Sequence, residues 1–262
     1  MISAAREVVR KIFWGLGYEI RRRVDLVDFL FSRRIDLVLD VGANTGQFAQ
    51  RLRARGYKSE IISFEPTSEP YRELVKSAAS DPNWQVHNVA LGTEAGHATI
   101  NIAQNSVYNS FRDQTAVAGA FDARSATIRQ EQVEITTIDA VLEGRQDRRV
   151  FLKIDTQGFE REILAGAAKS LPLILGVLLE VPIVHLYQET WALPDVLACL
   201  KGLGFVPAQI TPTNHLRQLD PVSLAEIDCV FRRMDDRLDG ARRPGHAAVA
   251  QNLVRATGLA AG

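Results

Sequence analysis

Short runs of apolar, β-branched residues alternate with helical stretches from residue 35 onward. The strands that this pattern predicts lie at residues 35–40, 60–65, 84–90, 97–103, 132–138, 150–155, 174–181, 205–211 and 226–232. Helices are predicted between several of them, at residues 47–55, 68–79, 159–169 and 194–203. Such an alternation predicts an α/β fold with a mainly parallel sheet that is covered by helices on both faces.

Two segments depart from this pattern. Residues 104–129 are polar and have no regular apolar period, and an irregular stretch of that length is typically a loop that faces a substrate. After Met234 the composition turns to Arg, Gly and Ala. We therefore expect an arm at residues 1–34, one domain at residues 35–233, and a C-terminal extension at residues 234–262 that is loosely ordered or helical.

The N-terminal arm is predicted to be a basic amphipathic helix. Its apolar residues recur at helical spacing and are Val8, Val9, Ile12, Phe13 and Leu16. Residues 1–34 hold eight basic and four acidic side chains. A helix of this kind can lie on an anionic membrane surface, but packing against the main domain or a second subunit is the commoner outcome. The sequence leaves peripheral membrane contact and a homodimer open.

Composition excludes several classes of protein. Among 262 residues, Lys plus Arg and Asp plus Glu each total 31, so the chain lacks the overall positive field of a protein that coats nucleic acid. No run approaches the roughly 20 apolar residues that span a bilayer. Cys199 and Cys229 have neither zinc-site nor disulfide-framework spacing and are expected to be buried thiols. We expect a cytoplasmic protein, either free or at the inner face of the membrane.

The sharpest motif is VLDVGANTGQFAQRL at residues 38–52. Gly42 lets the chain bend directly off the strand, and Gly46 lets the next helix begin close to whatever lies over the turn. The spacing is GxxxG, which differs from the GxGxxG of dinucleotide sites, and no GK[ST] follows as in a phosphate-binding P-loop. The turn therefore predicts a ligand site that lacks the usual pyrophosphate chemistry.

Polar residues at the next two strand ends extend this site. Glu65 ends the second strand, where a carboxylate can accept hydrogen bonds from both hydroxyls of a ribose. The stretch Asn88-Val89-Ala90-Leu91-Gly92 stands at the end of the third strand, where its side-chain amide and small residue suit the edge and face of an adenine. Glu65 could instead be a helix-start acid and Asn88 a turn residue. Taken together, however, they favour a nucleoside without a diphosphate, which points to S-adenosylmethionine.

These strings also carry a family resemblance. In order, they are DVGANTGQF, FEP, NVALG, the stretch Asn109-Ser110-Phe111, TTIDAV, FLKIDTQGFEREIL with its following Gly166, and LLEV…LY. Over residues 35–232 the chain resembles the FkbM family of S-adenosylmethionine-dependent O-methyltransferases. The resemblance implies a class I methyltransferase fold, a Rossmann-like, doubly wound sheet of seven strands in the order 3-2-1-4-5-7-6 with the last strand antiparallel. It also implies a sugar hydroxyl of a glycolipid, polysaccharide or glycosylated metabolite as the methyl acceptor.

The cofactor-binding residues predicted for S-adenosylmethionine are Asp40, Gly42, Asn44, Gly46, Glu65, Asn88 and Ala90. The resemblance implies that Asp40 and the two glycines face the methionine part. It further implies that Glu65 binds the ribose and that Asn88 and Ala90 face the adenine.

The chemistry of methyl transfer requires a group that deals with the acceptor's proton. Asp155 and Glu180 end neighbouring strands and could present two carboxylates to one pocket. Two readings stay open: the acids share an Mg²⁺ ion with the substrate oxygen, or one acts as a base while the other orients a sugar hydroxyl. His185 is a further candidate base. Asp155, Glu180 and His185 are thus the predicted catalytic residues, and Asp155 and Glu180 the predicted metal ligands.

The acceptor is expected to contact residues 104–129, Tyr187, Trp191 and the loop after Thr211, although Tyr187 and Trp191 are equally typical of core packing. The predicted partner is a sugar-containing small molecule or a glycolipid, and no nucleic acid. Two other functions stay open: an NAD-dependent oxidoreductase, which does not explain the missing third glycine, and a non-catalytic S-adenosylmethionine-binding module.

Overall fold

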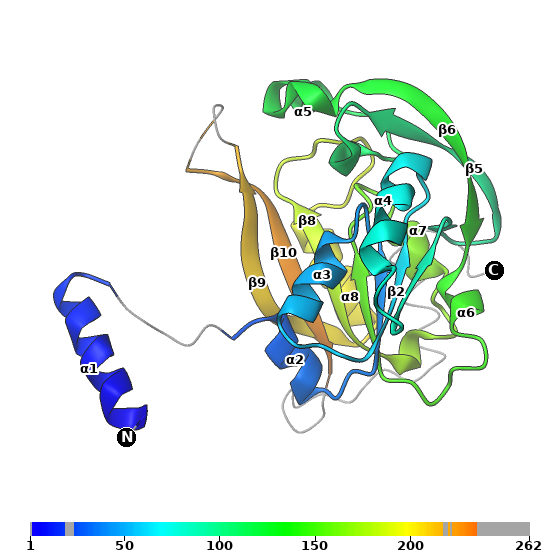
Figure 1. Cartoon of the computed structure of the whole chain (residues 1–262). Coiled ribbons are helices and arrows are strands. Elements are labelled where there is room, and N and C mark those ends of the chain that lie inside the picture. Colours follow the sequence, from blue (N-terminus) through cyan, green and yellow to red (C-terminus); the bar gives the residue numbers. More distant parts are fainter. Residues whose placement is uncertain (1, 19–23, 217–219, 221, 235–262) are drawn as a thin grey trace.

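Seven strands form the main sheet of the computed structural model, which describes residues 2–18, 24–216, 220 and 222–234. Their order is β3-β2-β1-β7-β8-β10-β9 (Figure 1). The strands are β1 (Leu37–Val41), β2 (Glu60–Phe64), β3 (Trp84–His87), β7 (Val150–Ile154), β8 (Ile174–Pro182), β9 (Phe205–His215) and β10 (Leu224–Arg233). β10 runs antiparallel to both of its neighbours, whereas β3, β2, β1, β7 and β8 pair in parallel. This confirms the predicted fold class, sheet order and reversed last strand.

Helices cover both faces of this sheet, as the alternating pattern predicts. They are α3 (Gln47–Ala54), α4 (Ser68–Ala78), α6 (Ile138–Val141), α7 (Glu160–Ala165), α8 (Leu193–Gly202) and the 3-10 helix η3 (Leu171–Leu173). Successive residues of β1 enter different cores: Leu37 and Leu39 pack in one cluster with residues of α7 and α8, and Val38 packs in another with residues of α3 and α4. Because both faces are buried, the strand is apolar except for Asp40.

A second, three-stranded sheet stands beside the main one. It consists of β4 (Ala90–Leu91), β6 (Thr127–Thr136) and β5 (Gly96–Ala103), in that order, with β5 and β6 antiparallel. The predicted strand at residues 132–138 ends at Thr136 instead. The side chain of Thr137 accepts a hydrogen bond from the Ala140 amide and begins α6 there.

The predicted loop at residues 104–129 contains ordered elements. These are η1 (Ser106–Tyr108), α5 (Ala116–Phe121), η2 (Ala123–Ser125) and the first residues of β6. The Asn101–Ser110 backbone bridge fixes one end of the segment, and the Gln114–Tyr187 bridge joins its middle to the chain after β8. The segment thereby stands over the carboxyl ends of the central strands (Figure 1).

The predicted N-terminal arm divides into two helices with different surroundings. In α2 (Leu26–Ser32), Val27, Phe29 and Leu30 are buried, and the ring of Phe29 lies 5.7 Å from that of Phe151. α1 (Ile2–Gly15) lies apart from the body of the protein (Figure 1). In the described parts of the chain, no helix is long and apolar enough to cross a membrane. The predicted C-terminal extension lies outside the described residues except for its first residue, Met234.

The two cysteines fulfil their prediction: Cys199 and Cys229 are buried and unpaired.

Candidate active site

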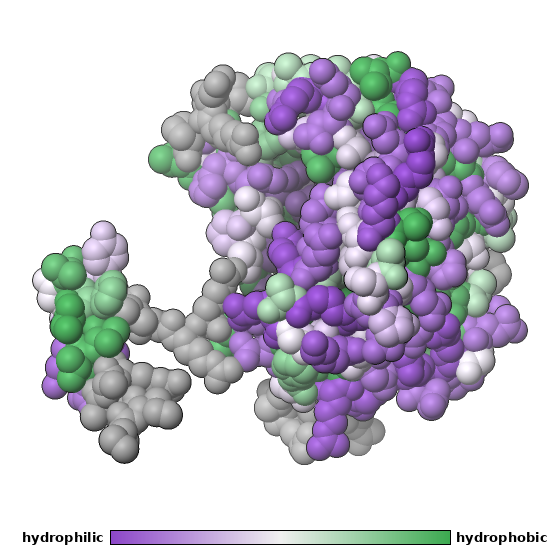
Figure 2. All heavy atoms as spheres, in the orientation of Figure 1, coloured by the Kyte–Doolittle hydropathy of each residue, from purple (hydrophilic) through white to green (hydrophobic). Residues whose placement is uncertain are grey.

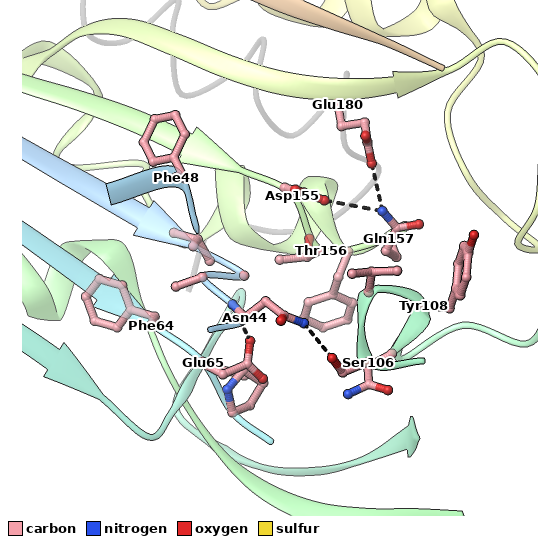
Figure 3. Close-up of a pocket in the computed structure, with 18 of the residues that line it drawn as sticks. Asn44, Phe48, Phe64, Glu65, Ser106, Tyr108, Asp155, Thr156, Gln157 and Glu180 are labelled. Atoms are coloured by element: carbon pink, nitrogen blue, oxygen red, sulfur yellow. Dashed lines mark hydrogen bonds between the residues drawn. The ribbon is translucent and has the colours of Figure 1, made fainter. Parts of the chain in front are cut away.

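A cavity of about 450 Å³ opens at the carboxyl ends of β1, β2, β7 and β8 (Figure 3). The turn after β1, Glu65 and residues 89–91 line one part of it. Asp155, Gln157, Glu180 and Glu226 line another part. Residues 105–109 of the segment between β5 and β6 add a third wall, so this segment does face the cavity, as predicted.

The turn after β1 has a backbone that only certain residues adopt. Gly42 has φ +73°, and a Cβ on it would lie 1.9 Å from the carbonyl oxygen of Asp155. Asn44 also has a positive φ, 49°, and its side-chain amide donates to the Ser106 hydroxyl at 3.0 Å. Both residues line the cavity. Glycine at 42 is therefore required by the neighbouring strand end, and Asn44 joins the turn to η1.

Gly46 does not line the cavity. A Cβ on it would lie 2.8 Å from Cη2 of the Trp84 ring, and its φ is +94°. The glycine thus allows α3 to begin against Trp84, and the structure does not support the prediction that Gly46 faces the methionine part of a cofactor.

Glu65 is held firmly at the cavity wall. One carboxylate oxygen accepts from the backbone N–H group of Asn44 at 2.9 Å (Figure 3). The other accepts from the backbone N–H group of Thr67 at 2.9 Å and from the Thr67 hydroxyl. Burial raises the pKa of Glu65, although these hydrogen bonds oppose the shift. A carboxylate offers about four lone-pair sites, so this one keeps acceptor capacity for a ligand hydroxyl.

Asn88 and Ala90 play different parts. The Asn88 amide donates to the carbonyls of Glu65 and Pro66, each at 2.9 Å, and its side chain is outside the cavity wall. The prediction that Asn88 reads an adenine is thus not supported, because its donors hold the turn behind Glu65. Ala90 does line the cavity, where it forms an apolar wall with Val89 and Leu91.

Asp40 lies beneath the cavity and not in its wall. It sits directly opposite Ser63 of β2 and Lys153 of β7 in the sheet register. Its carboxylate accepts from the Ser63 hydroxyl at 3.0 Å and lies 3.1 Å from Lys153 Nζ. Because the side chain is fully buried in these contacts, the structure does not place Asp40 against a cofactor.

Lys153 connects this buried pair to the cavity. Its ammonium donates to the carbonyls of Val41 and Gly42, at 3.2 and 2.8 Å, and lies 3.7 Å from Asp155. Burial by itself would lower the pKa of Lys153, but the charges of Asp40 and then Asp155 raise it above its ordinary value. The lysine is thus a buried cation that fixes the turn after β1.

Asp155 and Glu180 come together, as predicted, through the side chain of Gln157. The Gln157 amide nitrogen donates to Asp155 at 3.2 Å and to Glu180 at 2.7 Å (Figure 3). Gln157 has φ +55° and is followed by Gly158 at φ +106°, so this tight turn aims the amide back at the two acids.

Two further acids from β10 surround Glu180. Glu226 lines the same cavity, and Asp228 is the direct cross-strand partner of Glu180. Burial, followed by the charge of Asp155, raises the pKa of Glu180 well above its usual value. Burial raises the pKa of Glu226 as well, and burial and Asp155 together raise the pKa of Asp228 to about 6.

The comparisons with known proteins assign the family. The family model described as "Methyltransferase FkbM domain" matches residues 40–207, which is more than half of the chain. The chain belongs to the FkbM methyltransferase family. The class of reaction is accordingly methyl transfer. No curated protein sequence matches the chain.

Several solved methyltransferases are distantly similar to this FkbM-family chain. The 1,6-didemethyltoxoflavin-N1-methyltransferase of Burkholderia thailandensis, solved with S-adenosylhomocysteine, is 12% identical with a TM-score of 0.43 over 80% of this chain and 76% of that one. A putative tRNA (m1A22) methyltransferase of Streptococcus pneumoniae, in complex with S-adenosyl-L-methionine, is 14% identical with a TM-score of 0.43 over 80% and 73%. An rRNA methylase of Streptococcus thermophilus is 11% identical with a TM-score of 0.44 over 83% and 100%. Similarity at this level does not indicate which group accepts the methyl.

The predicted Mg²⁺ site does not fit the acids of this FkbM-family cavity. Magnesium prefers oxygen ligands in octahedral geometry. Here an amide N–H group, which is a donor, lies against both Asp155 and Glu180. Across the described residues, no group of three or more His, Cys, Asp or Glu is arranged to hold a metal ion. The hydrogen bonds from Gln157 favour the alternative prediction from the sequence, in which one of the two carboxylates acts as a base.

His185 is not brought to the cavity. Its Nδ1 atom lies 2.6 Å from the Thr190 hydroxyl, and its ring is outside the cavity wall. Tyr187 and Trp191 are buried, and the Tyr187 hydroxyl donates to the Tyr108 carbonyl. The structure thus supports neither His185 as the base nor the two aromatic residues as a sugar platform.

Sequence reasoning missed several residues of the cavity wall. Gln157 was detectable in principle, because the TQG sequence directly after a strand is typical of a positive-φ turn. Glu226 and Asn214 were not, since the register of β10 between β8 and β9 places them at the cavity. The predicted loop after Thr211 is instead the end of β9.

Proposed function

We propose that this protein transfers the methyl group of S-adenosylmethionine to a hydroxyl group of a sugar. The observation that carries the proposal is the division of one cavity into two chemically distinct parts. One part offers a turn, a buried carboxylate and an apolar wall, and the other offers a cluster of carboxylates in which burial raises the pKa of Glu180 and of Glu226.

The first part suits the donor. Glu65 keeps acceptor capacity for a ribose hydroxyl, because Asn44 and Thr67 make three hydrogen bonds to a carboxylate that offers about four acceptor sites. Val89, Ala90 and Leu91 give the apolar surface that an adenine ring requires. The turn at Gly42 and Asn44 joins Glu65 to Asp155, since Asn44 donates to Glu65 and Gly42 lies against the Asp155 carbonyl, so the methionine part would extend from the ribose toward Asp155.

The second part suits a hydroxyl acceptor. In the proposed step Glu180 takes the proton of the acceptor hydroxyl. The oxygen forms a bond to the methyl carbon while the bond from that carbon to the sulfonium sulfur breaks and leaves S-adenosylhomocysteine. A raised pKa makes Glu180 a stronger base than an ordinary carboxylate. Gln157 orients this carboxylate, since its amide donates to it at 2.7 Å.

The outer walls support a carbohydrate as the acceptor. The polar residues that line them are Asn105, Ser106, Tyr108, Asn109, Arg124 and Asn214. The amide and hydroxyl side chains among them both donate and accept hydrogen bonds, and Arg124 donates, which matches the many hydroxyls of a sugar ring. The carrier of that sugar is a glycolipid, a polysaccharide or a glycosylated metabolite.

The test is methyl transfer from labelled S-adenosylmethionine to lipid and polysaccharide extracts of the source cells, followed by mass spectrometry. The proposal predicts label on a carbohydrate oxygen, and loss of the label with Glu180→Gln. Label that is found on nitrogen, or that ribonuclease removes, would contradict it. The same holds for wild-type protein that labels no carbohydrate in either extract.

A further inference from the structure

α1 carries an apolar stripe that no other described part of the protein covers. Val8, Val9, Ile12 and Phe13 lie on one side of the helix and are between 40% and 57% exposed. At 100° per residue these positions span less than half of the helix circumference. Figure 2 shows the hydrophobic surface gathered along this helix, away from the body of the protein. The apolar residues of α2 are buried against the body of the protein, whereas those of the α1 stripe are exposed.

The other side of α1 is charged. Arg10 and Lys11 are exposed there, and Lys11 lies 3.6 Å from Glu7 in a solvent-exposed pair. The sequence continues with three consecutive arginines at residues 21–23. An apolar stripe next to a cluster of basic residues has the two signals that hold a helix on an anionic bilayer surface.

The most exposed aromatic ring of α1 lies outside the stripe. Trp14 is 70% exposed. At 100° per residue it lies on the charged side of the helix, roughly opposite the middle of the stripe. The surface available to acyl chains is therefore the stripe itself.

A second copy of the chain fits the stripe less well. A helix of 14 residues is about 21 Å long. A stripe of that length covers only a small part of the roughly 1,600 Å² that a stable protein interface buries.

We propose that α1 docks in the plane of an anionic lipid surface, with Val8, Val9, Ile12 and Phe13 in the acyl boundary and the basic residues at the headgroups. This inference is independent of the proposed methyl acceptor. It gives the protein a membrane-binding surface separate from the cavity.

The test is sedimentation of the full chain with vesicles of phosphatidylcholine alone and of phosphatidylcholine with phosphatidylglycerol. We expect binding to the anionic vesicles that falls at least roughly fivefold at high salt, because screening weakens the contact of the basic residues. The double variant Ile12→Gln/Phe13→Gln should lose binding by a similar factor. The matched control is Val75→Gln on α4, which replaces a residue that is 41% exposed on the body and should bind like the wild type.

Tryptophan fluorescence gives an independent readout. Of the three tryptophans, Trp84 and Trp191 are 6% exposed and Trp14 is 70% exposed. In the double variant Phe13→Trp/Trp14→Phe, which moves the exposed indole onto the stripe, anionic vesicles should cause a blue shift, whereas in Trp14→Phe alone they should cause none. Failure of the wild type to bind anionic vesicles at low salt would overturn the proposal, as would a dimer in solution that the Ile12→Gln/Phe13→Gln variant dissociates.

Discussion

The Nζ atom of Lys153 lies 3.1 Å from Oδ1 of Asp40, in an ion pair that is almost completely buried under the cavity floor. The two residues are direct cross-strand partners on β7 and β1. Since Lys153 also donates to the Val41 and Gly42 carbonyls, the pair fixes the turn on which the cofactor part of the cavity is built.

We expect Asp40→Asn to destabilise the protein by about 3 kcal/mol, because the variant leaves a buried ammonium with less compensating charge. Urea unfolding of both proteins measures the difference. The control is Glu73→Gln, which removes an exposed pair with Lys76 and should cost less than about 0.5 kcal/mol. An Asp40→Asn protein as stable as the wild type would contradict this role for the pair.

Glu180→Gln should lower kcat by about 100-fold or more and leave the affinity for S-adenosylhomocysteine nearly unchanged, since the residue is proposed to act only on the acceptor proton. A base works in its ionised form, so activity should fall as pH decreases through the raised pKa of Glu180. The acidic limb of the pH profile of kcat/KM should therefore lie well above pH 4.5 and be absent from the variant's residual activity. A limb that persists in Glu180→Gln would place the base elsewhere.

Asp228→Asn should stabilise the protein at pH 8. Asp228 faces Glu180 across the strands, and burial with the charge of Asp155 raises its pKa to about 6. Because folding raises its pKa, this carboxyl group contributes its full stability to the folded protein below its unfolded pKa near 3.8. That contribution is lost as pH rises through about 6. Thermal unfolding should show a gain of about 1–2 kcal/mol for the variant at pH 8, shrinking toward pH 4. A gain that is independent of pH would contradict the assignment.

Removal of divalent metal ions should leave turnover unchanged. Gln157 places a hydrogen-bond donor against both Asp155 and Glu180, which leaves this carboxylate pair unsuited to Mg²⁺. Initial rates of methyl transfer with and without EDTA measure the effect. A loss of activity in EDTA that added Mg²⁺ restores would contradict the metal-free step.

Much of the fold follows from the sequence because each strand of the main sheet carries its own local signal. β1 and β7 are buried on both faces and are apolar except for Asp40 and Lys153, and Gly42 and Asp155 follow them directly, so their type and place could be predicted. The segment at 104–129 could not be resolved into η1, α5 and η2, since contacts with distant residues such as Tyr187 fix it.

Part of the candidate site could also be predicted from local signals in the sequence. Glu65, Asp155 and Glu180 lie at strand ends, where order along the chain already brings them to one edge of the sheet. Asp40 and Asn88 have equally suitable side chains, but their hydrogen bonds point to Ser63 and to the backbone of residues 65–66. The direction of a side chain near a strand end depends on its neighbours in space, which a single sequence does not give.

The two parts of the cavity are proposed to bind different molecules, and calorimetric titration with S-adenosylhomocysteine distinguishes them. We expect the wild type to bind. Glu65→Gln should weaken the affinity about 10- to 100-fold, because it weakens hydrogen bonds to a charged carboxylate, and Glu180→Gln should stay within about twofold. A wild type that does not bind, or a Glu65→Gln affinity equal to that of the wild type, would contradict this proposal.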